Sequence, residues 1–206
     1  MSLVQTRVVL VITPLISLMN DQILKVPKWL SAACLNSYQT RDQRDEVIAA
    51  YKNGRLNVIM MSPERLFLEN LDYSKIGLVC VDEAHCVSEW SHNFRPSYLR
   101  LEGLLKERIP NVPRLALTAT ATLKTMVSVC KALQIEKEGV IKADEISRTN
   151  IFATVTRDTE KSGALITLLK SDRYKKLTSM IVYCTYKRTT EMVKGYLNVF
   201  CLSFTI

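Results

Sequence analysis

Val8-Val9-Leu10-Val11-Ile12 is a continuous run of apolar residues, and Val58–Met61 and Leu78–Val81 repeat the pattern. A strand covered on both faces has such a sequence, whereas a strand with one solvated face alternates between apolar and polar residues. The three runs therefore predict a parallel sheet between two layers of helices. The strands predicted in this way are Val8–Ile12, Ala32–Asn36, Asn57–Met61, Leu78–Asp82, Arg114–Thr118, Asn150–Val155 and Met180–Cys184.

Helical patterns fill the gaps between the predicted strands. Thr40 and Gln43 are spaced as a capping box, and the helix that they open is expected to end near Asn53-Gly54. Thr122 is in a position to cap a second helix. Further helices are predicted over Pro96–Arg108, Lys161–Leu169 and Lys187–Leu197. Alternating strands and helices predict a doubly wound α/β sheet.

The composition excludes several classes of protein. The 206 residues are 48% hydrophobic and 23% charged, which is ordinary for a globular protein and excludes disordered, collagen-like and coiled-coil chains. The sequence lacks the run of about 20 apolar residues that a membrane span needs, and we expect neither a span nor a secretory signal. Six cysteines without a C-x-x-C pair and two histidines favour neither a disulfide framework nor a zinc site. We expect a reduced, intracellular protein.

The chain is predicted to hold one domain and part of a second. The polar segment Glu136–Arg148 marks a boundary, which gives domains over residues 1–147 and 148–206. The second stretch has too few elements to close a core and ends in apolar residues, so we expect it to be truncated. It also holds 10 Lys and Arg against 4 Asp and Glu, which is most of the net charge of +8. This excess favours a polyanionic partner, although solvated basic faces would explain it equally well.

Two acids, Asp82 and Glu83, follow the apolar run Leu78–Val81. In doubly wound sheets ligands bind beyond the carboxyl ends of the strands. One carboxylate there can hold Mg²⁺ while the other polarises an attacking water, although an ordinary surface turn is the alternative. The segment Leu117–Thr122 follows another predicted strand. Its threonine hydroxyls are expected to hydrogen-bond His85 and to link the two strand ends.

Aromatic and basic side chains are concentrated between these two motifs. Both histidines of the chain and one of its two tryptophans fall within residues 85–98. Aromatic faces stack on unpaired bases with about 1–3 kcal/mol each, and Arg adds phosphate or cation–π contact. The segment predicts a loop that senses single-stranded nucleic acid; an aromatic mini-core beneath a loop is the alternative.

The sequence DEAHCVSEWSHNFRPSYLRL at residues 82–101, followed by LTATAT at 117–122, resembles the RecQ family of superfamily 2 DNA helicases. The WSHNFRP version is most similar to the branch associated with Rothmund–Thomson syndrome. Further resemblances are to helicase motif Ia at residues 9–22, to motif Ib at 61–66, to the crossing into a second lobe at 148–151 and to motif IV at 181–184. The resemblance implies a RecA-like sheet of the P-loop NTPase type, with a nearly complete first lobe over 1–147 and the start of a second over 148–206.

The resemblance also implies roles for individual residues. Asp82 would coordinate the Mg²⁺ of Mg-ATP and Glu83 would activate the hydrolytic water, with His85 communicating with Thr118 and Thr120. The implied DNA-binding residues are Pro14, Ser17, Ser62, Arg65, Trp90, His92, Phe94 and Arg95. The implied cofactors are ATP and Mg²⁺, and the implied partners are single-stranded and forked DNA. The implied activity is 3′-to-5′ unwinding in DNA replication, recombination and repair in the nucleus.

The sequence departs from the family pattern in three respects. No G-x-x-x-x-G-K-[ST] phosphate loop occurs in the 206 residues, motifs V and VI are absent, and Glu89 stands where the family usually has Gln. The phosphate loop supplies most of the stabilisation of the transferred phosphoryl group, so we expect these residues alone not to hydrolyse ATP. Two alternatives stay open. One is a non-catalytic chain that binds nucleic acid or a partner, and the other is a metal hydrolase built on Asp82, Glu83 and His85.

Overall fold

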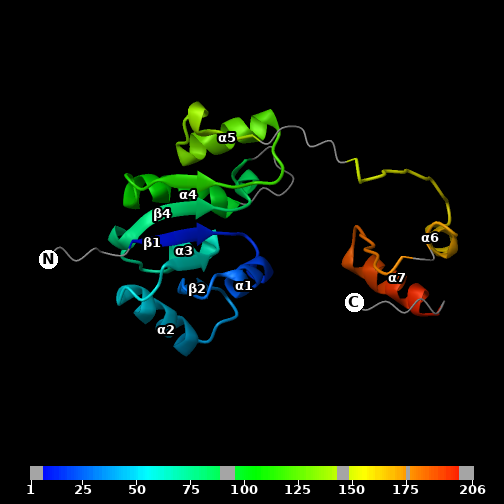
Figure 1. Ribbon diagram of the computed structural model, residues 1–206, viewed down its shortest axis with the longest axis horizontal. Helices are drawn as coiled ribbons and strands as arrows, with labels where there is room; N and C mark the ends of the chain where they lie inside the picture. The colour runs from blue at the N-terminus through cyan, green and yellow to red at the C-terminus, as the bar shows by residue number, and fades with distance from the viewer. Residues whose placement is uncertain (1–6, 89–95, 143–148, 175–176, 200–206) are drawn as a thin grey trace. The chain divides into compact units, whose positions relative to one another are not determined.

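The computed structural model describes residues 7–88, 96–142, 149–174 and 177–199 (Figure 1). The chain divides into two compact units, Met1–Ala143 and Asp144–Ile206. This division lies close to the predicted boundary at residue 147, and the assignment of the two units to two helicase lobes stays a prediction. Within the described ranges, no helix combines the length and the apolar character that crossing a membrane requires.

The first unit is built on a sheet of five parallel strands (Figure 1). The strands are β1 (Val8–Ile12), β2 (Ala32–Leu35), β3 (Val58–Met61), β4 (Ile76–Val81) and β5 (Arg114–Ala116), in the order β2-β3-β1-β4-β5. The five strands predicted for this part of the sequence are confirmed. Three of their predicted ends, at Asn36, Asp82 and Thr118, are wrong, because the chain leaves the ladder after Leu35, Val81 and Ala116.

The helices of the first unit are α1 (Ile16–Lys25), α2 (Arg41–Lys52), α3 (Pro63–Leu68), α4 (Pro96–Arg108) and α5 (Leu123–Leu133), with the short 3₁₀ helices η1 (Tyr73–Lys75), η2 (Ala84–Val87) and η3 (Lys137–Gly139). The three helices predicted in this unit, now α2, α4 and α5, are confirmed, whereas α1 and α3 were not predicted. The capping box is formed in both directions between Thr40 and Gln43, and Gly54 follows α2 with a φ of 68°. Thr122 caps α5 by accepting from the Thr125 backbone N–H. Local capping chemistry therefore fixes these helix ends.

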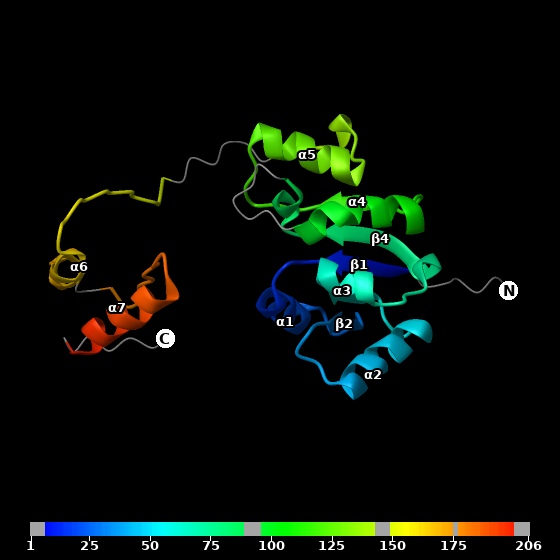
Figure 2. The same cartoon turned by 180° about the vertical axis from the view of Figure 1, so that it is seen from behind.

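The connections between the strands run in two directions across the sheet. The chain crosses from β1 to β2 in one direction, and then from β2 through β3 and β4 to β5 in the other. Right-handed crossovers place α1 on one face of the sheet and α3 and α4 on the opposite face. Helices α3 and α4 contact each other, and both lie in front of the sheet in Figure 2. The prediction of a doubly wound α/β sheet is confirmed.

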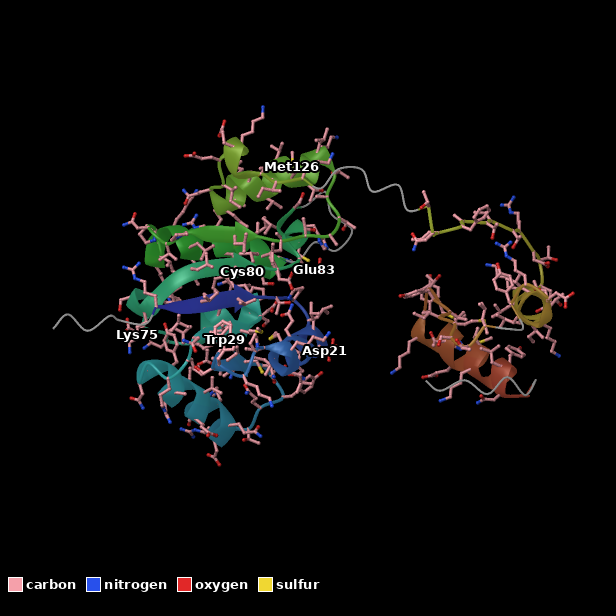
Figure 3. All side chains as sticks on the ribbon, in the orientation of Figure 1. Asp21, Trp29, Lys75, Cys80, Glu83 and Met126 are labelled. Carbon is pink, nitrogen blue, oxygen red and sulfur yellow. The ribbon has the colours of Figure 1, made fainter. Side chains whose placement is uncertain are left out.

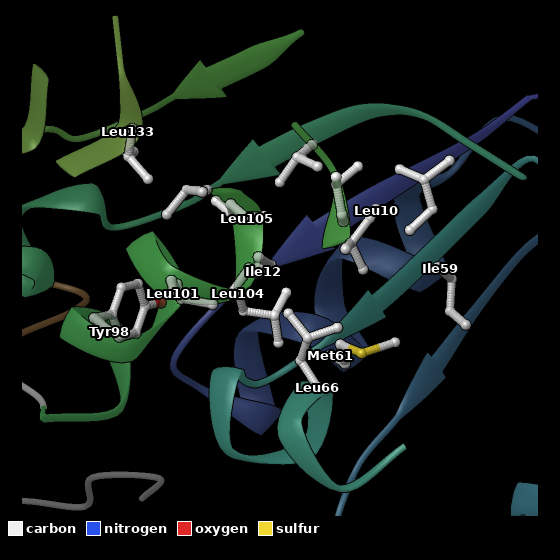
Figure 4. Packing of buried hydrophobic residues seen from close by; sticks show 14 of the residues in the cluster. Leu10, Ile12, Ile59, Met61, Leu66, Tyr98, Leu101, Leu104, Leu105 and Leu133 are labelled. Atoms are coloured by element: carbon white, nitrogen blue, oxygen red, sulfur yellow. The ribbon is translucent and has the colours of Figure 1, made fainter. Parts of the chain in front are cut away.

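The core of the first unit lies between one face of the sheet and α4 (Figure 4). Its fully buried side chains include Leu10, Ile12, Ile59, Met61, Leu101 and Leu105. Burial of each such side chain stabilises the fold by about 1.5–3 kcal/mol. On the opposite face of β1, Val9 and Val11 are only half-buried. The prediction from the continuous apolar runs is therefore correct for the buried face of the sheet. The opposite face is less buried than the runs predicted.

The second unit contains α6 (Lys161–Lys170) and α7 (Lys187–Val199), and both predicted helices are confirmed. The predicted strands Asn150–Val155 and Met180–Cys184 are wrong, because these described segments form no strand. Their side chains are largely in solvent, with Phe152 84% and Tyr183 91% exposed. A β-branched or aromatic run becomes a strand only when a neighbouring strand pairs with its backbone, and these two runs have no such neighbour among the described residues.

Candidate active site

Polar side chains meet at the carboxyl ends of β1 and β4, which are neighbours in the sheet. Thr13 follows β1, and Asp82 and Glu83 follow β4. The connections that leave these two strands run in opposite directions, so the two ends form the switch point of the sheet. Ligands of open α/β sheets bind beyond the carboxyl ends of the strands at this point.

The carboxylate of Asp82 is held from two sides. Its Oδ1 accepts a hydrogen bond from the Glu83 backbone N–H at 2.9 Å. Its Oδ2 accepts from Gln22 Nε2 on α1 at 3.2 Å and lies 3.5 Å from the hydroxyl of the fully buried Thr13. The backbone after β4 and the segment after β1 therefore fix the orientation of this acid together.

Glu83 has a left-handed backbone, with φ 47° and ψ 42°. A residue other than glycine adopts this conformation at a cost of about 1–2 kcal/mol, so the surrounding structure must impose it. The next residue supplies the constraint, because the Ala84 N–H donates to the Leu117 carbonyl at 2.9 Å and the Leu117 N–H donates to the Val81 carbonyl at 2.9 Å. Figure 3 shows Glu83 beyond the end of the strand that carries Cys80. Asp82 and Glu83 form an acidic turn, and these hydrogen bonds connect it to the end of β5.

His85 joins the acidic turn to the threonine segment. Its Nδ1 lies 2.9 Å from Thr118 Oγ1 and 3.2 Å from Glu83 Oε2, and the residue is 8% exposed. The Thr118 hydroxyl donates to the Thr120 carbonyl at 3.0 Å and lies 3.3 Å from the Thr120 backbone N–H. Because that hydroxyl has a single proton, it accepts from His85, and we assign a proton to Nδ1. The structure brings together all five residues to which a catalytic role was predicted, and those roles stay predictions.

The surroundings of Asp82 suit oxygen chemistry better than thiol chemistry. Burial, and then the negative charge of Asp82, raise the pKa of the Cys80 thiol above its usual value, so the thiol stays protonated.

In the described part of the chain, no three His, Cys, Asp or Glu side chains gather as a possible metal site. A cation bound at Asp82 would therefore take most of its ligands from water and from a substrate.

The residues predicted to follow the DNA backbone lie after β1 and β3, which are also neighbours in the sheet. Pro14 is buried, and Ser17 is exposed in the first turn of α1. Ser62 caps α3, where its hydroxyl accepts from the Arg65 backbone N–H at 3.3 Å. The Arg65 side chain is 18% exposed and forms an ion pair with Glu69 at 2.9 Å. Ser17 therefore presents the more accessible polar group, and Arg65 is engaged within its own helix.

The predicted DNA-sensing residues Trp90, His92, Phe94 and Arg95, together with Glu89, lie outside the described residues. Their assignment stays a prediction. The segment that follows them is tied to the acidic turn, because the hydroxyl of Tyr98, which is fully buried, donates to the Asp82 carbonyl at 3.3 Å.

Three residues at the site, Thr13, Gln22 and Tyr98, were not predicted from the sequence. Thr13 is the first polar residue after an apolar strand, at the same position relative to β1 as Asp82 relative to β4, and that position could have identified it. Gln22 lies within the stretch that resembles motif Ia, and the resemblance implies no role for it. No local pattern marks Gln22 or Tyr98, because both reach Asp82 only through the packing of helices on the sheet.

The family and the relatives that this chain resembles are all described as helicases. The family described as DEAD/DEAH box helicase matches residues 2–129. The chain is 38% identical to the ATP-dependent DNA helicase Q4 of Homo sapiens, over 94% of this chain and 16% of that protein. It is 38% identical to the ATP-dependent DNA helicase Q-like 5 of Arabidopsis thaliana, over 93% of this chain and 22% of that protein. It is 35% identical to the ATP-dependent DNA helicase RecQ of Haemophilus influenzae, over 89% of this chain and 30% of that protein. The chain therefore spans less than a third of the length of these relatives.

Proposed function

This chain belongs to the DEAD/DEAH box helicase family and has a RecQ-type sequence over most of its length, and on that premise we propose that it is part of an ATP-dependent DNA helicase that unwinds from 3′ to 5′. Its first unit has a RecA-like α/β sheet. In this proposal residues 1–147 belong to the first lobe of the motor and 148–206 begin the second. The proposed substrates are single-stranded and forked DNA in nuclear replication, recombination and repair.

The observation that carries the proposal is the convergence at the ends of β1, β4 and β5. Asp82 is bonded to Gln22, and His85 lies within hydrogen-bonding distance of both Glu83 and Thr118. A simple surface turn would not be bonded to the ends of two other strands. The arrangement suits a motor, because a change at the nucleotide can be transmitted to segments that follow β1 and β5.

The residues at the switch point fit the Mg²⁺ of Mg-ATP. Asp82 offers a carboxylate, and Gln22 Oε1 beside it is buried without a hydrogen-bond partner among the described residues. Proteins usually hold Mg²⁺ through one or two carboxylates and substrate phosphates, and the ion keeps several waters. When bound, the ion neutralises negative charge on the phosphates. The protein's part is to orient Asp82, which the Glu83 N–H and Gln22 do from two sides.

Glu83 is the proposed general base. Its carboxylate would accept the proton of the attacking water, and His85 Nδ1, 3.2 Å from Glu83 Oε2, limits the positions that this carboxylate can take. The bond from His85 to Thr118 connects the base to the threonine segment at the end of β5. A change in the position of Glu83 during hydrolysis would in this way be transmitted to Thr118 and Thr120.

We predict that a polypeptide of these 206 residues does not hydrolyse ATP, with or without single-stranded DNA. The reason is that no phosphate-loop motif occurs in its sequence, so the β- and γ-phosphates lack the backbone N–H groups and the Lys that neutralise them. The measurement is phosphate release with and without a single-stranded oligonucleotide. Hydrolysis that the Glu83→Gln variant abolishes would contradict the prediction. Absence of hydrolysis together with specific DNA binding would favour the non-catalytic alternative for this polypeptide.

We also predict weak binding of single-stranded DNA by the same polypeptide, sensitive to salt. Loss of one aromatic stacking partner in Trp90→Ala is expected to cost about 1–3 kcal/mol of binding free energy. Arg95→Ala is expected to reduce the slope of log K against log salt by about 0.7, the value for one phosphate contact to a single strand. Fluorescence anisotropy of a labelled oligonucleotide measures both. Binding that ignores salt and both substitutions would show that the loop assignment is wrong.

A further inference from the structure

The side chain of Gln22 has one polar atom, Oε1, to which the proposed function assigns no hydrogen-bond partner. Gln22 lies in α1, in which its Nε2 donates to Asp82 Oδ2 at 3.2 Å. The other end of the same amide, Oε1, is buried and has no hydrogen-bond partner among the described residues. A buried acceptor without a donor is costly, by about 1–3 kcal/mol, so such an atom in a native site usually has a partner that is not part of the chain.

The orientation of this amide follows from charge. Asp82 Oδ2 can only accept, so the end of the Gln22 amide that faces it must be the N–H₂ group. The oxygen is then directed away from Asp82 Oδ2 and needs a donor of its own. The hydroxyl of Thr13, which follows β1, lies 3.5 Å from Asp82 Oδ2. It forms no hydrogen bond with Gln22 among the described residues.

A water of a hydrated cation has the required chemistry. Mg²⁺ keeps several of its waters when it binds to proteins, and each such water is a strong hydrogen-bond donor. A carboxylate that holds the cation and a neighbouring amide oxygen that accepts from its water form two adjacent sites for one ion. Side chains that orient a metal-binding carboxylate in this way commonly change metal affinity when they are replaced.

We propose that Gln22 is a positioning residue for the cation site at Asp82: its Nε2 orients the carboxylate, and its Oε1 accepts a hydrogen bond from the hydration shell of the cation. This inference rests on the proposed role of Asp82 in the function given above. It adds a residue of α1, the helix whose first turn contains Ser17, to the machinery around the nucleotide.

The test uses Mn²⁺ alone as the probe and the 206-residue chain. Paramagnetic broadening of backbone amide signals in nuclear magnetic resonance spectra reports where the ion lies and how tightly it binds. In the unaltered chain, Mn²⁺ is expected to broaden the signals of residues 82–84 first. Gln22→Met keeps the length of the side chain and removes both polar atoms, and it is expected to weaken Mn²⁺ binding at this site by about tenfold or more.

Asp21→Asn is the matched control, because Asp21 is the exposed neighbour of Gln22 on the same helix. It removes a nearby negative charge without touching Asp82, so Mn²⁺ affinity at residues 82–84 is expected to stay close to that of the unaltered chain. Equal weakening by Asp21→Asn and Gln22→Met would reduce the effect to long-range attraction and would overturn the inference. Signals remote from the site show whether each variant keeps its fold.

The role of Gln22 and the cation site at Asp82 are distinguished by different outcomes. If Mn²⁺ broadens residues 82–84 equally in the unaltered chain and in Gln22→Met, the role of Gln22 is wrong and the cation site at Asp82 stands. If Mn²⁺ does not localise at residues 82–84 in the unaltered chain, or if Asp82→Asn leaves the broadening unchanged, the cation site itself is wrong and the inference falls with it.

Discussion

Glu83→Gln is expected to slow DNA-stimulated ATP hydrolysis by about 10²- to 10⁴-fold in a chimera that contains a complete motor. In this chimera, residues 1–206 replace the matching stretch of the Homo sapiens helicase Q4, which shares 38% identity over 94% of this chain. The substitution keeps the size of the side chain and removes its ability to take a proton from water. It leaves the left-handed turn unchanged, because that turn is fixed by backbone bonds from Ala84 and Leu117.

Glu46→Gln is the control for this experiment, since Glu46 is an exposed acid on α2, away from the switch point. Its rate is expected to equal that of the unaltered chimera. Phosphate release at saturating ATP and single-stranded DNA gives the comparison. A chimera in which Glu83→Gln and Glu46→Gln hydrolyse ATP equally fast would show that Glu83 is not the general base.

Tyr98→Ala is expected to lower the free energy of unfolding of the first unit by about 3–5 kcal/mol, as for other large buried aromatic residues. Tyr98 is fully buried and stands among the leucines of α4 in Figure 4. Its hydroxyl also donates to the Asp82 carbonyl at 3.3 Å. Tyr98→Phe keeps the ring and removes the hydroxyl that donates this bond, so it is expected to cost about 0.5–1.5 kcal/mol.

Urea unfolding of the 206-residue chain, followed by circular dichroism, measures both changes. Tyr38→Ala is the matched control, because Tyr38 is 84% exposed and its replacement is expected to change the free energy by less than about 0.5 kcal/mol. A small effect of Tyr98→Ala, similar to that of Tyr38→Ala, would contradict the burial of Tyr98 under the acidic turn. If Tyr98→Phe lowers the free energy of unfolding as much as Tyr98→Ala does, the larger contribution does not come from the ring, and the prediction is wrong.

The sheet and the meeting of its acids with the threonine segment were predictable from sequence. Continuous apolar runs such as Val8–Ile12 identify strands of a parallel sheet, and helices between them make every strand point the same way. The carboxyl ends of such strands share one edge. Asp82 and Thr118, each placed just after a run, therefore had to lie at the same edge of the sheet, whatever the length of the loop between them.

The contacts within that edge were not predictable, because they depend on packing between distant elements. Gln22 reaches Asp82 across 60 residues of sequence, and nothing near Gln22 specifies how α1 lies against the sheet. The left-handed conformation of Glu83 is imposed by bonds to the end of β5, and its own side chain does not favour it. The two wrong strands, Asn150–Val155 and Met180–Cys184, have the same cause: strand formation requires a partner that the local sequence does not describe.

The most direct test of the central claim, that these residues carry the nucleotide-responsive lobe of a DNA helicase, is strand separation by the chimera on a duplex with a 3′ single-stranded tail. The account predicts separation that requires both ATP and Mg²⁺ and that does not occur when the tail is 5′. A folded chimera that leaves the 3′-tailed duplex intact, or that separates it equally well without ATP, would contradict the account.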